Sequence, residues 1–172
     1  MASKKTSRSA LRKKAARIEL AVFDVDGVMT DGRLYIGPAG QEFKTVHIHD
    51  GHGLKLLQRA GVEVAVISGR RSDAMEARLT DLGVHHAFMG VADKLAIFCA
   101  LLEELNLEPH QAAYMGDDEP DLAPLRLAGL ALSVCNAMPE VRAAADWVST
   151  REGGDGAVRE ACELLIAARG KK

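Results

Sequence analysis

Short apolar segments typical of buried strands alternate with helical segments along nearly the whole chain. Repeated β-α-β units favour a parallel sheet with right-handed crossovers and helices on both faces. We therefore expect an α/β fold built on a doubly wound, mostly parallel sheet. Hydrophobic residues make up 48% of the 172 residues and aromatic residues only 4%, so we expect a core of aliphatic side chains, as buried parallel strands require.

The hydrophobic pattern predicts where these elements lie. The expected strands of the sheet are 19–25, 62–67, 86–89, 112–115, 130–134 and 147–148. The expected helices are 11–17, 51–60, 72–82, 93–106, 120–127, 139–145 and 156–168. Segments 33–36 and 42–48 flank the turn-rich run Gly37-Pro38-Ala39-Gly40, which predicts a small β-hairpin insertion.

The composition indicates one domain that binds neither nucleic acid nor a membrane. Residues 1–10 are expected to be a disordered basic tail, and residues 11–172 a single domain whose C-terminal tail starts at about residue 150. A net charge of −2 argues against a general nucleic-acid binder. No apolar stretch approaches the roughly 20 residues of a membrane span. Three cysteines without C-x-x-C spacing indicate reduced thiols in a cytoplasmic protein.

Two aspartates, Asp24 and Asp26, end the first strand and are followed by Gly27. Alternate residues of a strand project from the same face, and glycine lets the chain turn beneath a ligand. Asp24 can then attack phosphorus while Asp26 transfers protons to and from the reacting oxygens. An isolated Asp-x-Asp pair is weak evidence for a catalytic site, so this prediction depends on the polar groups that follow the later strands.

Three further polar motifs follow the first in order. They are Ser68-Gly69 after the second strand, Asp93-Lys94 at the start of a helix, and Gly116-Asp117-Asp118 after a later strand. The carboxyl ends of strands in a doubly wound sheet converge on one crevice, where ligands bind. Carboxylate oxygens of Asp24 and Asp117, with the Asp26 carbonyl, can bind Mg²⁺. Ser68, Gly69 and Lys94 can bind phosphate oxygens.

These four motifs together resemble the phosphatases of the haloacid dehalogenase (HAD) superfamily. The resemblance implies an aspartyl-phosphate intermediate, with Asp24 as nucleophile, Asp26 as general acid and base, and Lys94 as the third catalytic residue. It also implies that Asp121 orients Lys94 or a metal-bound water. Asp118 would be either a further metal contact or only a helix N-cap.

The short spacing between the motifs leaves no room for a cap domain, and the details resemble the capless 3-deoxy-D-manno-octulosonate (KDO) 8-phosphate phosphatases. The resemblance covers about residues 12–168, on segments 24–32, 50–54, 68–70, 76–83, 93–94, 116–118 and 153–160. It implies Mg²⁺-dependent hydrolysis of KDO 8-phosphate in lipopolysaccharide precursor biosynthesis. It also implies a homotetramer assembled through the hairpins, with the segment 153–159 lying over a neighbour's site.

Several residues are candidates for contacts with the substrate. The candidates are Asp31, His52, Arg70, Arg78 and Arg159. Asp31 could instead be a turn residue. The Thr30 hydroxyl could either face the phosphate or satisfy a hydrogen bond within the turn. His52 and Met89 depart from the family's usual residues, which leaves 2-keto-3-deoxynononate 9-phosphate and N-acetylneuraminate 9-phosphate as alternative substrates.

Two other functions remain as alternatives. A non-catalytic oligomerisation module, of the kind found in sialate cytidylyltransferases, would need no intact set of acids. The cluster of His47, His49 and His52 with Asp50 could be a transition-metal site, or a polar rim beside the substrate.

Overall fold

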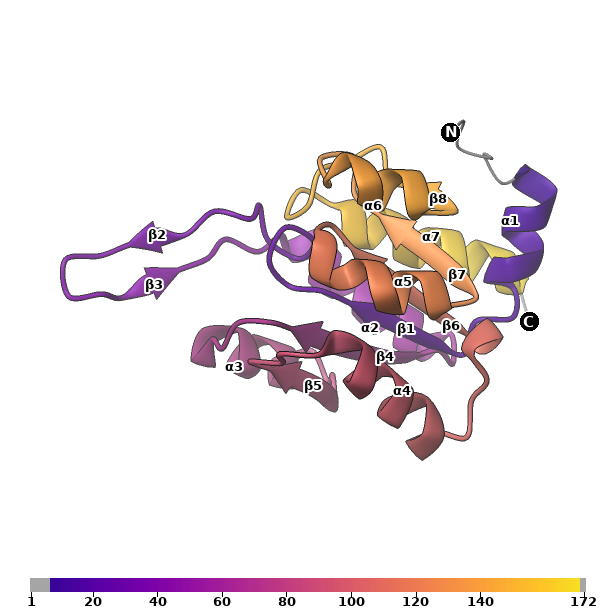
Figure 1. Cartoon of the computed structure of the whole chain (residues 1–172), viewed down its shortest axis with the longest axis horizontal. Coiled ribbons are helices and arrows are strands. Elements are labelled where there is room, and N and C mark those ends of the chain that lie inside the picture. The colour runs from indigo at the N-terminus through magenta and orange to yellow at the C-terminus, as the bar shows by residue number, and fades with distance from the viewer. Residues whose placement is uncertain (1–6, 171–172) are drawn as a thin grey trace.

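The computed structural model describes residues 7–170, which form a parallel six-stranded sheet with helices on both faces (Figure 1). Every neighbouring pair of strands in this sheet is parallel. The strand order is β5 (His86–Met89), β4 (Glu63–Ser68), β1 (Leu20–Phe23), β6 (Ala112–Gly116), β7 (Leu130–Ser133) and β8 (Trp147–Val148). The expected doubly wound α/β fold without a cap domain is confirmed.

The helices divide between the two faces of the sheet. One face carries α1 (Arg8–Ala15), α2 (Ile48–Arg59), α3 (Asp73–Asp81) and α7 (Ala157–Arg169). The other carries α4 (Lys94–Glu104), α5 (Leu122–Leu127) and α6 (Pro139–Ala144), with short 3₁₀ turns at Pro109–Gln111 and Glu119–Asp121. The core between the layers is mainly aliphatic, as the composition predicts, and its largest buried side chains include Phe23, Phe98 and Tyr114.

The strand order places a topological switch point at the centre of the sheet. From β1 the chain winds outward through β4 to β5, then returns to the opposite side of β1 to form β6, β7 and β8. Loops leaving the carboxyl ends of β1 and β6 therefore diverge to opposite faces and open a crevice between them. Residues that follow these two strands lie at the rim of that crevice.

The hairpin extends away from the body of the domain as a long arm (Figure 1). Its strands are β2 (Tyr35–Ile36) and β3 (Glu42–Phe43), paired antiparallel as Tyr35 with Phe43 and Ile36 with Glu42. Both strands are shorter than expected, and helix α2 begins at Ile48, so the second arm does not continue as a strand to that residue. The expected hairpin exists, but its ladder is two residue pairs long.

Helix starts follow their capping residues. The Ser72 hydroxyl accepts a hydrogen bond from the Met75 amide, and the Asp93 carboxylate accepts one from the Ala96 amide. Helix α1 begins at Arg8, three residues before its expected start, with Ser7 as its cap. Residues 8–10 are thus helical, and the first six residues of the expected disordered tail lie outside the described part of the chain.

The C-terminal helix α7 is part of the core, packed along α2. The Asp50 carboxylate on α2 accepts hydrogen bonds from the Arg159 amide at 2.7 Å and the Gly156 amide at 3.3 Å, so it caps the N-terminus of α7. Gly53 permits the close crossing, since a Cβ there would lie 3.1 Å from the Cα of Arg159. The chain after residue 150 therefore belongs to the domain's own packing.

The segment before α7 packs against the loop that follows β1. The Gly154 amide donates to the Val28 carbonyl at 3.0 Å, and the Gly153 amide donates to the Asn136 side chain at 3.0 Å. A side chain at Gly153 would overlap the carbonyl of Gly27. The glycines of this segment are therefore fitted to the loop of their own chain, and the expectation that the segment lies over a neighbour's site remains a prediction about the assembly.

No helix among the described residues is long and apolar enough to cross a membrane.

Replacing Asp50 by alanine is expected to destabilise the domain by about 1–2 kcal/mol, because two amides at the start of α7, one buried and one partly buried, lose their acceptor. Urea unfolding followed by circular dichroism measures the change. Asp81→Ala, which removes an exposed carboxylate from the last turn of α3, is the matched control. A free energy of unfolding equal in the two variants would show that the cap contributes nothing.

Candidate active site

The predicted motifs meet at the carboxyl end of the central strands. Asp24 directly follows β1, Ser68 ends β4, and Asp117 directly follows β6. Lys94 is the first residue of α4, whose N-cap is Asp93, and its side chain reaches from that helix to the crevice. Four residues that are far apart in the sequence are thus brought to one edge of the sheet.

Lys94 forms an ion-paired bridge between two buried carboxylates. Its ammonium lies 2.9 Å from Oδ1 of Asp24 and 2.8 Å from Oδ1 of Asp121, and all three side chains are at most 7% exposed. Burial alone lowers the pKa of Lys94, but attraction and hydrogen bonding from the two carboxylates outweigh it and raise that pKa. The lysine is therefore held in its charged form.

Asp121 is the anchor of this arrangement. Its carboxylate is fully buried and also accepts hydrogen bonds from the Tyr114 hydroxyl at 2.9 Å and the Asp117 amide at 3.2 Å. A side chain at Gly116 would overlap the Cβ of Asp121, so only glycine permits this approach. The predicted role of Asp121 in orienting Lys94 agrees with these contacts.

Three carboxylates here are close enough to share a cation. Asp24, Asp117 and Asp121 each offer an oxygen within 4.8 Å of the others. Burial, with repulsion from the neighbouring acids, raises the pKa of Asp24 to about 7 and that of Asp117 to about 8. Oδ1 of Asp117 is buried and forms no hydrogen bond with any described residue. Excess negative charge and an unused oxygen fit a hard divalent cation such as Mg²⁺.

The ligand set expected from the sequence was Asp24, Asp26 and Asp117, and the side-chain cluster overlaps it at Asp24 and Asp117. Asp26 was assigned through its carbonyl oxygen, and its carboxylate points elsewhere. Gly27, at φ +88°, lets the loop after β1 pass close to Asp117, because a Cβ there would overlap that carboxylate. The glycine turn predicted beneath the ligand thus makes room for the Asp117 side chain of the carboxylate cluster.

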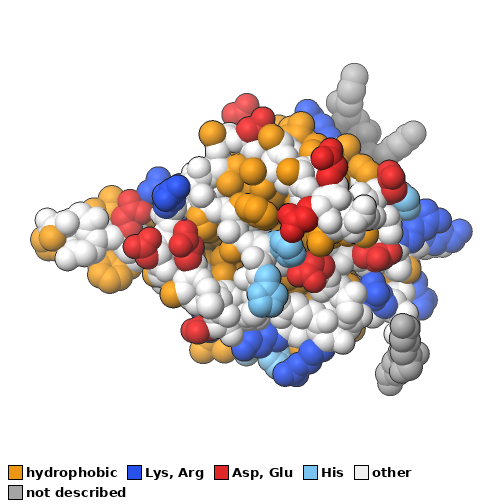
Figure 2. Space-filling model, turned by 90° about the horizontal axis from the view of Figure 1, so that it is seen from below, with side chains coloured by type: hydrophobic (Ala, Val, Ile, Leu, Met, Phe, Trp, Pro, Cys, Tyr) orange, Lys and Arg blue, Asp and Glu red, His pale blue; other side chains and the backbone are white. Residues whose placement is uncertain are grey.

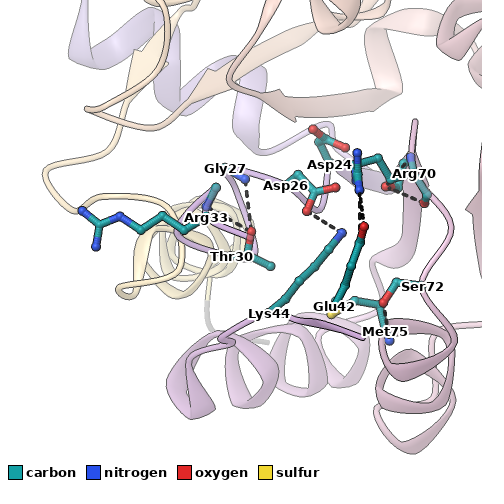
Figure 3. A network of polar contacts seen from close by, with 12 residues as sticks. Asp24, Asp26, Gly27, Thr30, Arg33, Glu42, Lys44, Arg70, Ser72 and Met75 are labelled. Carbon is teal, nitrogen blue, oxygen red and sulfur yellow. Dashed lines mark hydrogen bonds and ion pairs between the residues drawn. The ribbon is translucent and has the colours of Figure 1, made fainter. Parts of the chain in front are cut away.

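The Asp26 carboxylate is paired with Lys44, a hairpin residue that the sequence analysis did not select. Lys44 Nζ lies 2.6 Å from Asp26 Oδ1, and the lysine side chain is only 4% exposed (Figure 3). Two positions earlier, Glu42 pairs with Arg70 at 2.9 Å. Alternate residues on a strand share a face, so the Glu42–Lys44 spacing was the available signal.

The predicted phosphate-binding group lies at the end of β4. The buried Ser68 hydroxyl accepts a hydrogen bond from the Arg70 amide, and the exposed Gly69 follows it in the loop. A Cβ on Gly69 would have only the Val91 carbonyl oxygen within 4 Å, so its backbone is open to an approaching ligand.

Several predicted residues have structural roles in this chain. Asp31 forms a turn by accepting a hydrogen bond from the Arg33 amide. The Thr30 hydroxyl accepts hydrogen bonds from the Gly32 amide and from the Gly27 amide, the latter drawn in Figure 3. The exposed Asp118 accepts from the Glu119 amide, which is the helix-cap alternative.

The remaining predicted substrate contacts are not joined to the acids. Within residues 7–170, no described hydrogen bond or ion pair links His52, Arg78 or Arg159 to Asp24, Asp26 or Lys94. His52 is exposed on α2, Arg78 extends toward Gly51, and Arg159 pairs with Glu163 at 2.7 Å.

The histidines do not form a metal cluster. His47 caps α2 by accepting a hydrogen bond from the His49 amide at Nδ1, and their rings are 4.8 Å apart. In the described part of the chain, the one group of three ligating side chains close enough to hold an ion is the aspartate cluster. The transition-metal alternative therefore lacks a ligand set here.

Comparison with known proteins places this geometry in context. The haloacid dehalogenase-like hydrolase family matches residues 50–129. The 3-deoxy-D-manno-octulosonate 8-phosphate phosphatase KdsC of Escherichia coli K12 is 42% identical over 158 residues, covering 92% of this chain and 84% of that protein.

Two solved structures extend the similarity to three dimensions. The KDO 8-phosphate phosphatase of Moraxella catarrhalis, in complex with magnesium, phosphate and KDO, is 39% identical with a TM-score of 0.93, covering 95% of this chain and 94% of that chain. The cobalt-bound enzyme of Haemophilus influenzae is 37% identical with a TM-score of 0.88, covering 92% of each.

Mg²⁺ is expected to stabilise the fold, because it relieves repulsion among three closely spaced carboxylates. At a hundred times its dissociation constant a ligand adds about 2.7 kcal/mol, which corresponds to a rise in Tm of roughly 5–10 °C for a domain of this size. Differential scanning fluorimetry with matched ionic strength measures the shift. Asp117→Asn should lose it, and an undiminished shift in that variant would place the ion elsewhere.

Proposed function

The chain belongs to the family of KDO 8-phosphate phosphatases within the HAD-like hydrolases, and we propose that it hydrolyses KDO 8-phosphate to KDO and phosphate with Mg²⁺ as cofactor. The main observation in support is the buried Lys94, which forms ion pairs with Asp24 and Asp121. These two aspartates belong, with Asp117, to a carboxylate cluster suited to a cation. The reaction would serve lipopolysaccharide precursor biosynthesis.

The first chemical step transfers the phosphoryl group to the protein. The Asp24 carboxylate attacks phosphorus, and the bond between phosphorus and the sugar oxygen breaks. Asp26, as general acid, gives its proton to the departing alkoxide. Lys94 offsets the charge of the phosphate oxygens, while Ser68 and the backbone at Gly69 hold the remaining ones.

The second step returns the site to its starting state. Asp26 now removes a proton from water, the water oxygen attacks the phosphorus of the Asp24 acyl phosphate, and inorganic phosphate leaves. The sum of the two steps is ester plus water giving alcohol plus phosphate. Mg²⁺, held by Asp24, Asp117 and the Asp26 carbonyl, supplies positive charge against which the phosphate is bound.

The sugar acid needs contacts outside this centre. The candidates for its anionic group are Arg70, Arg78 and Arg159, because guanidinium groups bind carboxylates through two parallel hydrogen bonds. Arg70 lies beside the site, where it pairs with Glu42. His52 and Asp31 remain candidates for further contacts, Asp118 supports the loop as a cap, and Asp121 supports Lys94.

Other activities are less well supported. A non-catalytic module would have no need of a nucleophile, a lysine and a metal cluster in contact with one another. The same chemistry on 2-keto-3-deoxynononate 9-phosphate or N-acetylneuraminate 9-phosphate is the closest alternative, since the acids do not distinguish among these sugars. The relative that contains KDO favours the eight-carbon substrate.

We propose that the protein is a homotetramer assembled through its hairpins. The arm exposes large apolar side chains, as the space-filling view shows at its end (Figure 2). The exposed fractions are 47% for Tyr35, 70% for Ile36 and 61% for Phe43. An apolar group of this kind on a projecting arm is typical of a protein interface.

The three unpaired cysteines support a cytoplasmic location, where thiols stay reduced.

Asp24→Asn is expected to reduce turnover of KDO 8-phosphate at least a hundredfold, about 2.7 kcal/mol of lost barrier reduction, because an amide is a poor nucleophile. Phosphate release from KDO 8-phosphate and from the two nine-carbon phosphates is compared for the wild type, the variant and Asp81→Asn. Activity of Asp24→Asn above a hundredth of the wild-type value would refute Asp24 as the nucleophile. A higher wild-type kcat/KM for a nine-carbon phosphate would refute KDO 8-phosphate as the preferred substrate.

Ile36→Glu combined with Phe43→Glu should dissociate the assembly, because carboxylates would have to be buried at the arm. Sedimentation velocity of the wild type and the double variant measures the mass of each. Arg33→Met, an exposed residue at the base of the arm, is the control. A monomeric wild type, or a double variant that stays tetrameric, would contradict the hairpin interface.

A further inference from the structure

We propose that Lys44 is a positioning residue for Asp26, delivered to the active site by the hairpin. Lys44 Nζ lies 2.6 Å from Oδ1 of Asp26 (Figure 3). The inference rests on the proposed phosphatase chemistry, in which Asp26 moves the proton to and from the reacting oxygens. Lys44 itself does not touch the substrate in this account.

The burial of Lys44 shows that the contact is specific. The lysine side chain is 4% exposed, and among residues 7–170 its ammonium forms an ion pair with Asp26 and no hydrogen bond with any other group. A buried, unpaired ammonium costs several kcal/mol, so an exposed position would be preferred if Asp26 did not hold it. Arg33, on the opposite arm of the hairpin, is exposed and forms no described ion pair.

The ion pair with Lys44 involves one carboxylate oxygen of Asp26 and leaves the other available for proton transfer. Oδ1 is fixed by the ammonium, while no hydrogen bond from a described residue reaches Oδ2, and the side chain remains 26% exposed. A carboxyl group with one oxygen held and the other open presents the open oxygen in a defined direction. A general acid must meet the leaving oxygen at hydrogen-bond distance, so this orientation bears directly on its efficiency.

A second ion pair holds the same arm of the hairpin at the site. Glu42, in strand β3 two residues before Lys44, pairs with Arg70 at 2.9 Å (Figure 3). The two pairs join this arm to the loops that follow β1 and β4. Lys44 therefore reaches Asp26 from an element that both loops help to hold.

Substrates with different leaving groups can test whether Lys44 positions Asp26 as a general acid. An alkoxide leaves poorly without a proton, whereas a nitrophenolate leaves without one. Loss of acid positioning should therefore lower kcat/KM for alkyl phosphates and spare kcat/KM for 4-nitrophenyl phosphate, since that ratio covers only the steps through departure of the alcohol.

The experiment compares Lys44→Met, Lys44→Arg and Arg33→Met with the wild type on three esters with Mg²⁺ present. The esters are KDO 8-phosphate, ribose 5-phosphate and 4-nitrophenyl phosphate. For Lys44→Met we expect kcat/KM to fall roughly a hundredfold on both alkyl esters and less than about threefold on the aryl ester, within the usual range for general acids. Lys44→Arg should recover part of the loss, and Arg33→Met should match the wild type.

Equal losses on alkyl and aryl esters, or no loss, would overturn the positioning role and leave the proposed phosphatase intact. A wild type active on ribose 5-phosphate but inactive on KDO 8-phosphate would overturn the substrate assignment, while the alkyl-to-aryl comparison still tests Lys44. A crystal structure of Lys44→Met provides a readout that does not depend on activity. An unchanged direction of the Asp26 carboxylate in that structure would also overturn the proposal.

Discussion

The rest of the site depends on the contact of one buried lysine with two buried aspartates. Lys94 stands at the first position of a helix, where the helix dipole disfavours a cation, and burial adds a further cost. Asp24 and Asp121 compensate for both, at 2.9 and 2.8 Å. The contact also reduces the repulsion between these two carboxylates. Asp24, the proposed nucleophile, is thereby held beside a fixed positive charge before any substrate arrives.

The topology explains how these groups meet. β1 and β6 are neighbours, yet two strands of the sheet, β4 and β5, lie between them in the sequence, so Asp24 and Asp117 reach one crevice from distant segments. Close approach then depends on small residues, since Gly27 leaves space for Asp117 and Gly116 leaves space for Asp121. The glycines of the motifs therefore serve the packing of acids as much as the turning of the chain.

Much of this could be read from the sequence, because strand periodicity and the polar residues at strand ends report local structure directly. The sheet and the helix starts at Ser72 and Asp93 followed from such local signals. The meeting of Asp24 with Lys94 followed from the convergence of strand ends in a doubly wound sheet and from the family resemblance. The role of Lys44 did not, because the Glu42–Lys44 spacing indicates a shared face of the arm but does not say that this face folds back onto Asp26. The packing of Gly153 against its own chain was missed for the same reason, since both are contacts between distant segments.

The central claim is that Asp24 carries the phosphoryl group during turnover. The most direct test is to quench the enzyme during hydrolysis of KDO 8-phosphate, reduce it with borohydride, and map the peptides by mass spectrometry. Borohydride converts an aspartyl phosphate to homoserine, so the account predicts homoserine at position 24, with more of it in Asp26→Asn, where water activation is lost. Modification at another residue, or none in either protein while the wild type turns over, would contradict the account.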